Sequence, residues 1–203
     1  MIDISKLLTI AISMIFVNNF ILSKFLGLCP FLGVSKETKP ALSMGAAVIF
    51  VMTCSAAITW LLYYFVLLKF NIEYLRTITF ILVIAAFVQF IEMVIRKNSP
   101  GLYKSLGIYL ALITTNCAVL GVTILNVDDF FIGGKAVQAS FISAVFQAFF
   151  AGIGFLLALI LMSGIRERLE FIDLPECMKG IPIAFIIASL MSLGFMGFSG
   201  FRF

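Results

Sequence analysis

The 203-residue chain contains no histidine, which excludes any chemistry that depends on an imidazole base or metal ligand. It also lacks a glycine-rich phosphate-binding loop, and its charged connections are too short to form a soluble nucleotide-binding domain. No feature of the chain indicates a nucleic acid as a partner. The remaining candidates for chemistry are four cysteines.

Charge is also scarce, because only 12% of the residues are Asp, Glu, Lys or Arg, while 63% are hydrophobic and 23 are Phe. No soluble fold could bury that much apolar surface, so the chain is expected to be an integral membrane protein. A bilayer needs about 20 apolar residues per helical span. The charges delimit six such runs and therefore predict six spans: 7–23, 40–68, 77–91, 105–127, 136–165 and 180–201.

Basic residues predict how the chain is oriented. If the spans alternate, nine basic residues share the side of the connections after spans one, three and five: Lys24, Lys36, Lys39, Arg96, Lys97, Lys104, Arg166, Arg168 and Lys179. The opposite side holds five: Lys6, Lys69, Arg76, Lys135 and Arg202. The excess favours a cytoplasmic location for the first group, with both termini outside.

A short motif occurs twice, as Cys29-Pro-Phe-Leu-Gly-Val-Ser35 and as Cys117-Ala-Val-Leu-Gly-Val-Thr123. Aligning the two cysteines also aligns a three-span half, residues 1–98, with a second three-span half, residues 99–203. Because three is odd, the second copy enters the bilayer upside down. The sequence therefore predicts an all-α membrane fold of two inverted three-helix repeats.

The helices are expected to be interrupted at these motifs. Only eleven uncharged residues separate Lys24 from Lys36, which is too few to cross a bilayer. Gly27, Pro30 and Gly33 surround Cys29 and weaken helical hydrogen bonding, so the break is expected around them. In the second copy, the polar residues 114–116 are placed to satisfy freed backbone groups.

The cysteines allow more than one interpretation. Cys54 and Cys177 have no repeated surroundings and are interpreted as packing and as a reduced cytoplasmic thiol. Cys29 and Cys117 form a pair that could be structural, or could form a disulfide, bind zinc or hold an iron–sulfur cluster. Zinc and two-iron clusters need four ligands, so a second subunit would have to supply the other two. Gly33 and Gly121 are interpreted as packing glycines, and backbone amides near them are expected to point toward the site.

Several long segments resemble a known family: FVNNFILSKFLGLCPFLGVSK, YLRTITFILVIAAFVQFIEMVIRK, LGIYLALITTNCAVLGV, GIRERLEFIDLP and LMSLGFMGFSG. They are similar to the A subunits of Rnf complexes and, more distantly, to the E subunit of the sodium-translocating NADH:quinone reductase. VNNF and LCPFLGVSK are more typical of the Rnf branch. The resemblance covers essentially the whole chain.

The resemblance implies that Cys29 and Cys117, with two cysteines of a homologous E subunit, bind an intramembrane 2Fe-2S cluster. Further implied partners are the B, C, D and G subunits of an ion-translocating ferredoxin:NAD oxidoreductase in the cytoplasmic membrane of a bacterium or archaeon. Na⁺ or H⁺ would move through the complex, and no flavin is expected in this chain. The chain alone would not be catalytic. The alternative is an ion-conducting or secondary-transporter subunit whose cysteines are structural, because inverted repeats with broken helices also build transport sites.

Overall fold

The computed structural model describes residues 4–70, 72–98, 112–130, 137–169, 171–172, 175 and 178–200. Within these ranges every regular element is helical and there is no strand. Cys177 and the basic residues Lys104, Lys135 and Arg202 lie outside the described residues.

The chain begins with α1 (Ile4–Ile12), which continues as the π-helical turn η1 (Ser13–Val17). A short helix, α2 (Leu28–Val34), precedes the long α3 (Thr38–Leu62), which runs through η2 (Tyr63–Leu67) into α4 (Leu68–Phe70). The 3-10 turn η3 (Glu73–Leu75) leads into α5 (Arg76–Asn98). The second half contains α7 (Cys117–Phe130), α8 (Val137–Leu169), α9 (Ile181–Met196) and the 3-10 turn η5 (Gly197–Gly200).

Three helical stretches are long and apolar enough to cross a membrane: Thr38–Phe70, Arg76–Val94 and Phe141–Leu169. Two further apolar helices are shorter, Leu7–Val17 and Ile181–Met196. The prediction of an all-helical protein with membrane-spanning helices is therefore confirmed at this level. Leu7–Val17 ends before the first cysteine motif, where an interruption is expected. Ile181–Met196 is at neither motif, and it is shorter than the predicted span 180–201.

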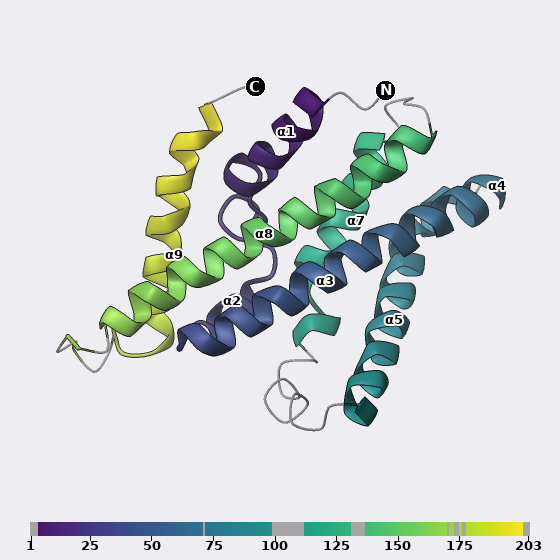
Figure 1. The fold of residues 1–203 in the computed structure, drawn as a ribbon. Helices are drawn as coiled ribbons and strands as arrows, with labels where there is room; N and C mark the ends of the chain where they lie inside the picture. The colour runs from purple at the N-terminus through teal and green to yellow at the C-terminus, as the bar shows by residue number, and fades with distance from the viewer. Residues whose placement is uncertain are drawn as a thin grey trace.

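The centre of the fold is the pair α3 and α8, which run antiparallel along each other (Figure 1). Small residues let them approach closely: a Cβ on Gly152 would lie 2.9 Å from the Cα of Ile49, and one on Gly45 would collide with Leu156. Close contact through glycine is the usual way in which helices associate in lipid, where no hydrophobic force drives them together. Met44, Met52 and Phe155 are fully buried in this interface.

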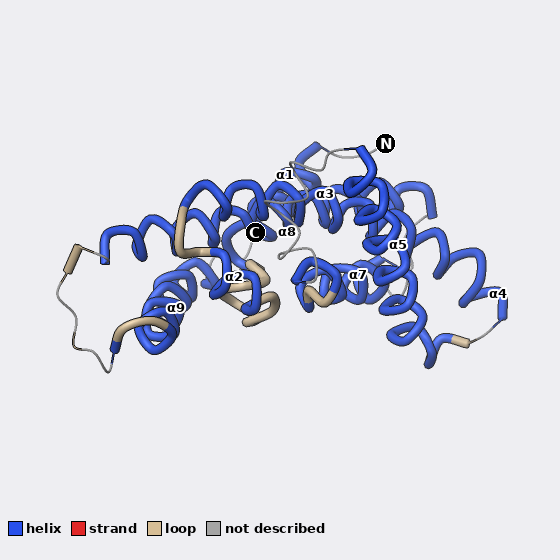
Figure 2. Tube along the Cα trace, turned by 90° about the horizontal axis from the view of Figure 1, so that it is seen from below, coloured by secondary structure: helices blue, strands red, loops and turns tan. Residues whose placement is uncertain are grey.

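The other helices lie around this pair. Seen from below, α2, α7 and α9 lie on one side of the layer that α3 and α8 form, and α5 stands at the edge (Figure 2). The outward faces of α5 and α9 are apolar, with Leu82, Phe90, Ile181 and Leu190 each 60–68% exposed. Apolar patches of this extent indicate contact with lipid or with another subunit.

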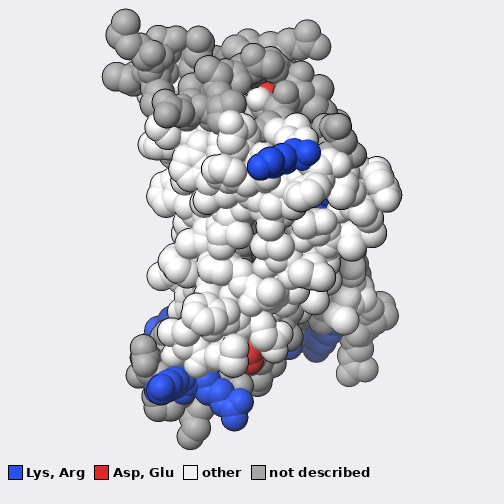
Figure 3. Space-filling model, turned by 90° about the vertical axis from the view of Figure 1, so that its right-hand side faces the viewer, with Lys and Arg blue, Asp and Glu red and all other residues white. Residues whose placement is uncertain are grey.

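The charges lie toward the ends of the molecule. On the face shown in Figure 3, the described charged side chains lie toward the top and bottom, and uncharged side chains cover the band between them. The start of α1 and the end of α9 lie at one end, whereas the start of α3 and the ends of α5 and α8 lie at the other (Figure 1). An uncharged band between charged ends is typical of a protein that spans a bilayer.

Candidate functional site: two facing cysteine motifs

The chain leaves regular helix at residues 18–27, directly before the first cysteine motif. Asn19 is fully buried there and holds the irregular segment with its side-chain amide. Its Nδ2 donates to the carbonyl oxygens of Ile15 (3.1 Å) and Gly154 (2.8 Å), and its Oδ1 accepts from the amides of Ile21 (3.1 Å) and Leu22 (3.3 Å). Asn19 is therefore a structural residue that satisfies backbone groups which lipid could not.

The end of α9 also supports this segment. The Ser192 hydroxyl donates to the Leu22 carbonyl at 2.6 Å. Phe20, Ile21 and Leu22 are each only 1% exposed, so this part of the non-helical segment is enclosed by protein, whereas Ser23, Lys24 and Phe25 are exposed. Irregular backbone at membrane depth is stable only in such surroundings.

Gly27 closes the break and precedes the first residue of α2. Its φ of 81° is in the left-handed region, which glycine adopts without a steric penalty. A Cβ at this position would lie 2.8 Å from Oδ1 of Asn116 and 2.8 Å from a ring carbon of Phe155. Both the backbone conformation and the close approach of Asn116 therefore require glycine.

Cys29 lies in the first turn of α2, which begins at Leu28. The expectation that Pro30 and Gly33 belong to the break was wrong, because both lie within this helix. Pro30 is tolerated because a first-turn residue needs no intrahelical partner for its missing amide hydrogen. The interruption therefore precedes the cysteine.

The second break has the same relation to its cysteine. Residues 112–114 are helical, and a new helix, α7, begins at Cys117. The buried Asn116 caps it, since its Oδ1 accepts from the Ala118 amide at 3.0 Å. This confirms the prediction that a polar residue before Cys117 compensates a freed backbone group.

The two motifs contact each other. Gly27, two residues before Cys29, lies against Asn116 and Ala118, the two neighbours of Cys117. A Cβ on Gly121 would lie 2.9 Å from Cδ1 of Leu26, which confirms the packing role predicted for this glycine. The fold therefore brings together two segments that are 88 positions apart in the sequence.

Both thiols face outward, and Cys29 and Cys117 are exposed, whereas Cys54 is half-buried in α3. In the described part of the chain, no three or more Cys, Asp or Glu side chains are grouped so that they could hold a metal ion. Both thiols are therefore accessible from outside the chain. Beside Cys117, the buried Nδ2 of Asn116 has no hydrogen-bond partner among the residues that the structure describes.

Comparison with known proteins identifies the family of this chain. The family described as "Rnf-Nqr subunit, membrane protein" matches residues 7–202. The chain belongs to the Rnf-Nqr family.

Curated Rnf-Nqr relatives match over nearly the full length. A protein of Acetobacterium woodii, named as the A subunit of a Na(+)-translocating ferredoxin:NAD(+) oxidoreductase complex, is 52% identical over 196 residues, which cover 97% of this chain and 98% of the relative. A protein of Syntrophotalea carbinolica, named as the A subunit of an ion-translocating oxidoreductase complex, is 51% identical over 195 residues, which cover 96% and 97%. The resemblance to Rnf A subunits that the motifs indicate is thus confirmed.

The structure of this chain corrects two further expectations. The amide of Gly121 lies inside α7, four residues after its start, so it belongs to the helix and does not point to a site at Cys117. Gly33 is not a tight packing glycine, because the nearest atom to a Cβ there would be Cδ1 of Leu112 at 4.0 Å. The polar side chain that precedes the second cysteine is Asn116.

Lys24 follows the buried part of the first break. Its Nζ lies 5.3 Å from the centre of the Phe20 ring, and it interacts electrostatically with Asp129 near the end of α7. Asp129 also accepts a hydrogen bond from Nε2 of the buried Gln147 at 3.0 Å. The hydrogen bond between Gln147 and Asp129 joins α8 to α7, and no local sequence pattern indicates it.

Proposed function

We propose that this chain is the A-type subunit of an ion-translocating ferredoxin:NAD oxidoreductase complex in the cytoplasmic membrane of a bacterium or archaeon. Its role in that complex is to carry electrons within the membrane through a 2Fe-2S cluster that it shares with a homologous E-type subunit. The observation that carries the proposal is the pair of exposed thiols, Cys29 and Cys117, on two helix starts whose flanking residues touch. Membership in the Rnf-Nqr family supports the type of complex.

The ligand count supports a shared site. A two-iron cluster usually takes four protein ligands, and this chain offers two of matching character. Cys29 and Cys117 would hold one side, and two cysteines of the partner would hold the other. When bound, such a cluster supplies one-electron transfer across a region that is otherwise insulating.

The residues around the thiols suit an anionic group. Nδ2 of Asn116, which has no partner among the described residues, can donate a hydrogen bond toward negative charge next to Cys117. Phe20 and Leu26 pack against Gly121 behind the motif and keep water away from that side. Gly27 lets the two segments approach, because any side chain would push Asn116 aside.

The inverted-repeat architecture remains part of the proposal, with residues 1–98 and 99–203 as the two halves and six spans in total. The stretch Thr38–Phe70 and helix α8 are both 33 residues long, and they pair antiparallel at the centre. A helix starts at or just before the cysteine in each motif. These features are what a pseudo-two-fold axis between α3 and α8 would produce.

For orientation, we propose that the end of the molecule that carries the start of α3 and the ends of α5 and α8 faces the cytoplasm. It carries Lys36, Lys39, Arg96, Lys97, Arg166, Arg168 and Lys179. The termini would then face outward. The B, C, D and G subunits would complete the complex, which couples electron transfer to Na⁺ or H⁺ movement.

A second candidate is a subunit that conducts ions and whose cysteines are structural. It is favoured by the polar side chains along α7 and α8: Asn126 and Gln147 are each 2% exposed, and Oδ1 of Asn126 has no partner among the described residues. A buried, unsatisfied oxygen within a membrane protein can mark a cation path. The two roles are compatible within one complex.

The test is replacement of each cysteine by serine in the assembled complex. Cys29→Ser and Cys117→Ser should each remove one iron–sulfur signal from the electron paramagnetic resonance spectrum and lower the iron content per complex by about two atoms, as expected for one two-iron cluster. Cys54→Ser is the matched control and should change neither. Retention of every cluster in both variants, together with ion flux by this chain in liposomes, would favour the second candidate.

A further inference from the structure

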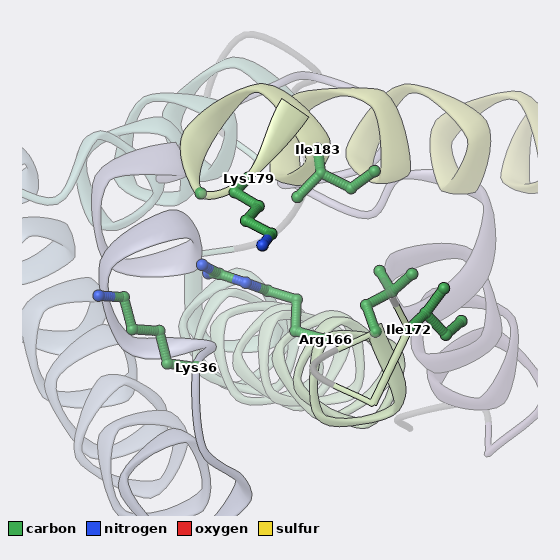
Figure 4. A pocket seen from close by; sticks show the side chains of 7 residues that line it. Lys36, Arg166, Ile172, Lys179 and Ile183 are labelled. Atoms are coloured by element: carbon green, nitrogen blue, oxygen red, sulfur yellow. The ribbon is translucent and has the colours of Figure 1, made fainter. Parts of the chain in front are cut away.

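A pocket of about 350 Å³ lies at the end of the molecule where α2, α8 and α9 meet. Its lining is made of three cationic residues and an apolar side: Lys36, Arg166, Lys179, Leu169, Ile172, Gly180 and Ile183. In Figure 4, Lys179 extends toward the guanidinium of Arg166, and Ile172 and Ile183 lie on the opposite side. Lys36 lies beyond that guanidinium, with its ammonium directed away from it. The pocket is therefore cationic on one side and apolar on the other.

Arg166 is held in place by the first cysteine motif. Its Nη1 donates to the Leu32 carbonyl at 2.8 Å and to the Ser35 hydroxyl at 2.9 Å, at the end of α2. Ser35 is fully buried. The guanidinium is thus fixed, with Lys36 following directly after Ser35 in the chain.

The lysines approach from two separate elements. Lys36 comes from the turn between α2 and α3, whereas Lys179 comes from the residues that precede α9. Glu167, next to Arg166, accepts a hydrogen bond from the Thr38 amide at its Oε1 (2.9 Å). Cationic side chains from separate elements around one pocket favour an anion as its ligand.

We infer that this pocket binds the phosphate headgroup of an anionic phospholipid, with an acyl chain along the apolar side. The position supports a lipid, because the pocket lies at the charged end of apolar helices, where headgroups are found. On the face of α9 that carries Ile183, Ile186 and Leu190 lie one and two turns further along and are 42% and 63% exposed, so they offer an apolar surface for the chain. A free phosphate ion would need only the cationic side and would gain nothing from Ile172 and Ile183.

The proposal is tested on the whole complex, delipidated in detergent and titrated with phosphatidylglycerol. Native mass spectrometry counts the lipids that are retained. Each basic residue near a membrane surface contributes about 1 kcal/mol to binding of anionic lipid, so loss of one lysine should weaken this site about 5-fold. The double variant Lys36→Gln/Lys179→Gln should weaken it roughly 30-fold.

The matched control is Lys39→Gln/Lys97→Gln. It removes the same charge from the same end of the molecule, but neither lysine lines the pocket. This control and the conservative Lys36→Arg/Lys179→Arg should both retain the lipid. The connection between α8 and α9 carries Glu170, Asp173 and Glu176, and their conversion to amides should leave the lipid bound or strengthen binding.

Other outcomes would overturn the inference. Equal weakening by the two double variants would show that only net charge matters. Equal binding of phosphatidylcholine, or displacement of the lipid by millimolar inorganic phosphate, would show an apolar site or a free-anion site. Loss of a partner subunit from the Lys36→Gln/Lys179→Gln complex at saturating phosphatidylglycerol would assign the pocket to an acidic protein surface. The iron content of these variants should stay unchanged, because no proposed iron ligand is replaced. The lipid proposal and the cluster proposal can therefore fail independently.

Discussion

Asn19 and Asn18 are adjacent in the sequence but are expected to differ sharply in their contribution to stability. Asn19 makes four hydrogen bonds through its buried side chain, two donated and two accepted. The Asn18 side chain donates one hydrogen bond, from its Nδ2 to the Ser13 hydroxyl at 3.1 Å. Asn19→Ala and Asn18→Ala therefore form a matched pair that differs in the number of bonds removed.

The magnitude follows from that number. Hydrogen bonds within membrane proteins contribute about 0.6 kcal/mol each on average, so Asn19→Ala should cost about 2.4 kcal/mol and Asn18→Ala about 0.6 kcal/mol. The cost at Asn19 should exceed this value, because buried amides left without a partner add about 1–3 kcal/mol each. Asn19 can approach the backbone of α8 closely, because Gly154 has no side chain at this point.

Unfolding of the purified complex in detergent, induced by heat or by denaturant, measures the difference in stability between the two variants. The rate at which a maleimide labels Cys29 in the iron-depleted complex provides a second measurement, because loss of Asn19 should release the segment that leads to α2. Equal unfolding of the two alanine variants, or a smaller cost for Asn19→Ala than for Asn18→Ala, would contradict the role assigned to Asn19. A complex that loses stability without any change in Cys29 labelling would separate the fold from the position of the thiol.

Three other substitutions test the contacts of Gly27 and Arg166. Gly27→Ala should destabilise the chain by about 1–3 kcal/mol, because alanine is strained at φ 81° and its Cβ would collide with Asn116. Gly33→Ala should be tolerated, because no atom lies close to a Cβ there. Thermal unfolding compares the two variants, and equal effects would contradict the structure. Arg166→Lys keeps the charge but loses the guanidinium that donates to Ser35 at the end of α2. It should lower the stability of the chain by about 1–3 kcal/mol in the same assay. An unchanged stability would show that only the charge of Arg166 is needed.

The sequence was sufficient to predict the class of protein, the two cysteine motifs and the presence of breaks near them. These features depend on composition and on residues close together in the chain, such as Gly27 before Cys29 and Asn116 before Cys117. The position of the first break was predicted wrongly, because a proline can end a helix but also fits well in the first turn of a new helix, where Pro30 lies. Only the helix start at Leu28 decides between these cases.

The long-range contacts could not be predicted. Asn19 bonds to the Gly154 carbonyl 135 positions away, and a backbone carbonyl carries no sequence signature. Arg166 likewise reaches a backbone oxygen and the Ser35 hydroxyl at the end of α2, 131 or more positions earlier. In the sequence, Arg166 was interpreted only as one of the charges that orient the chain.

The bond from Ser192 to the Leu22 carbonyl has a consequence for how the protein matures. The first irregular segment enters the membrane early in synthesis, but two of its supports, α8 and α9, are made last. During translation the backbone around Leu22 must therefore wait for the final helix before all of its polar groups are satisfied. The position of Cys29 becomes fixed only when synthesis of the chain is nearly complete. In a chain that is truncated before α9, the Cys29 thiol should therefore not be held in one position.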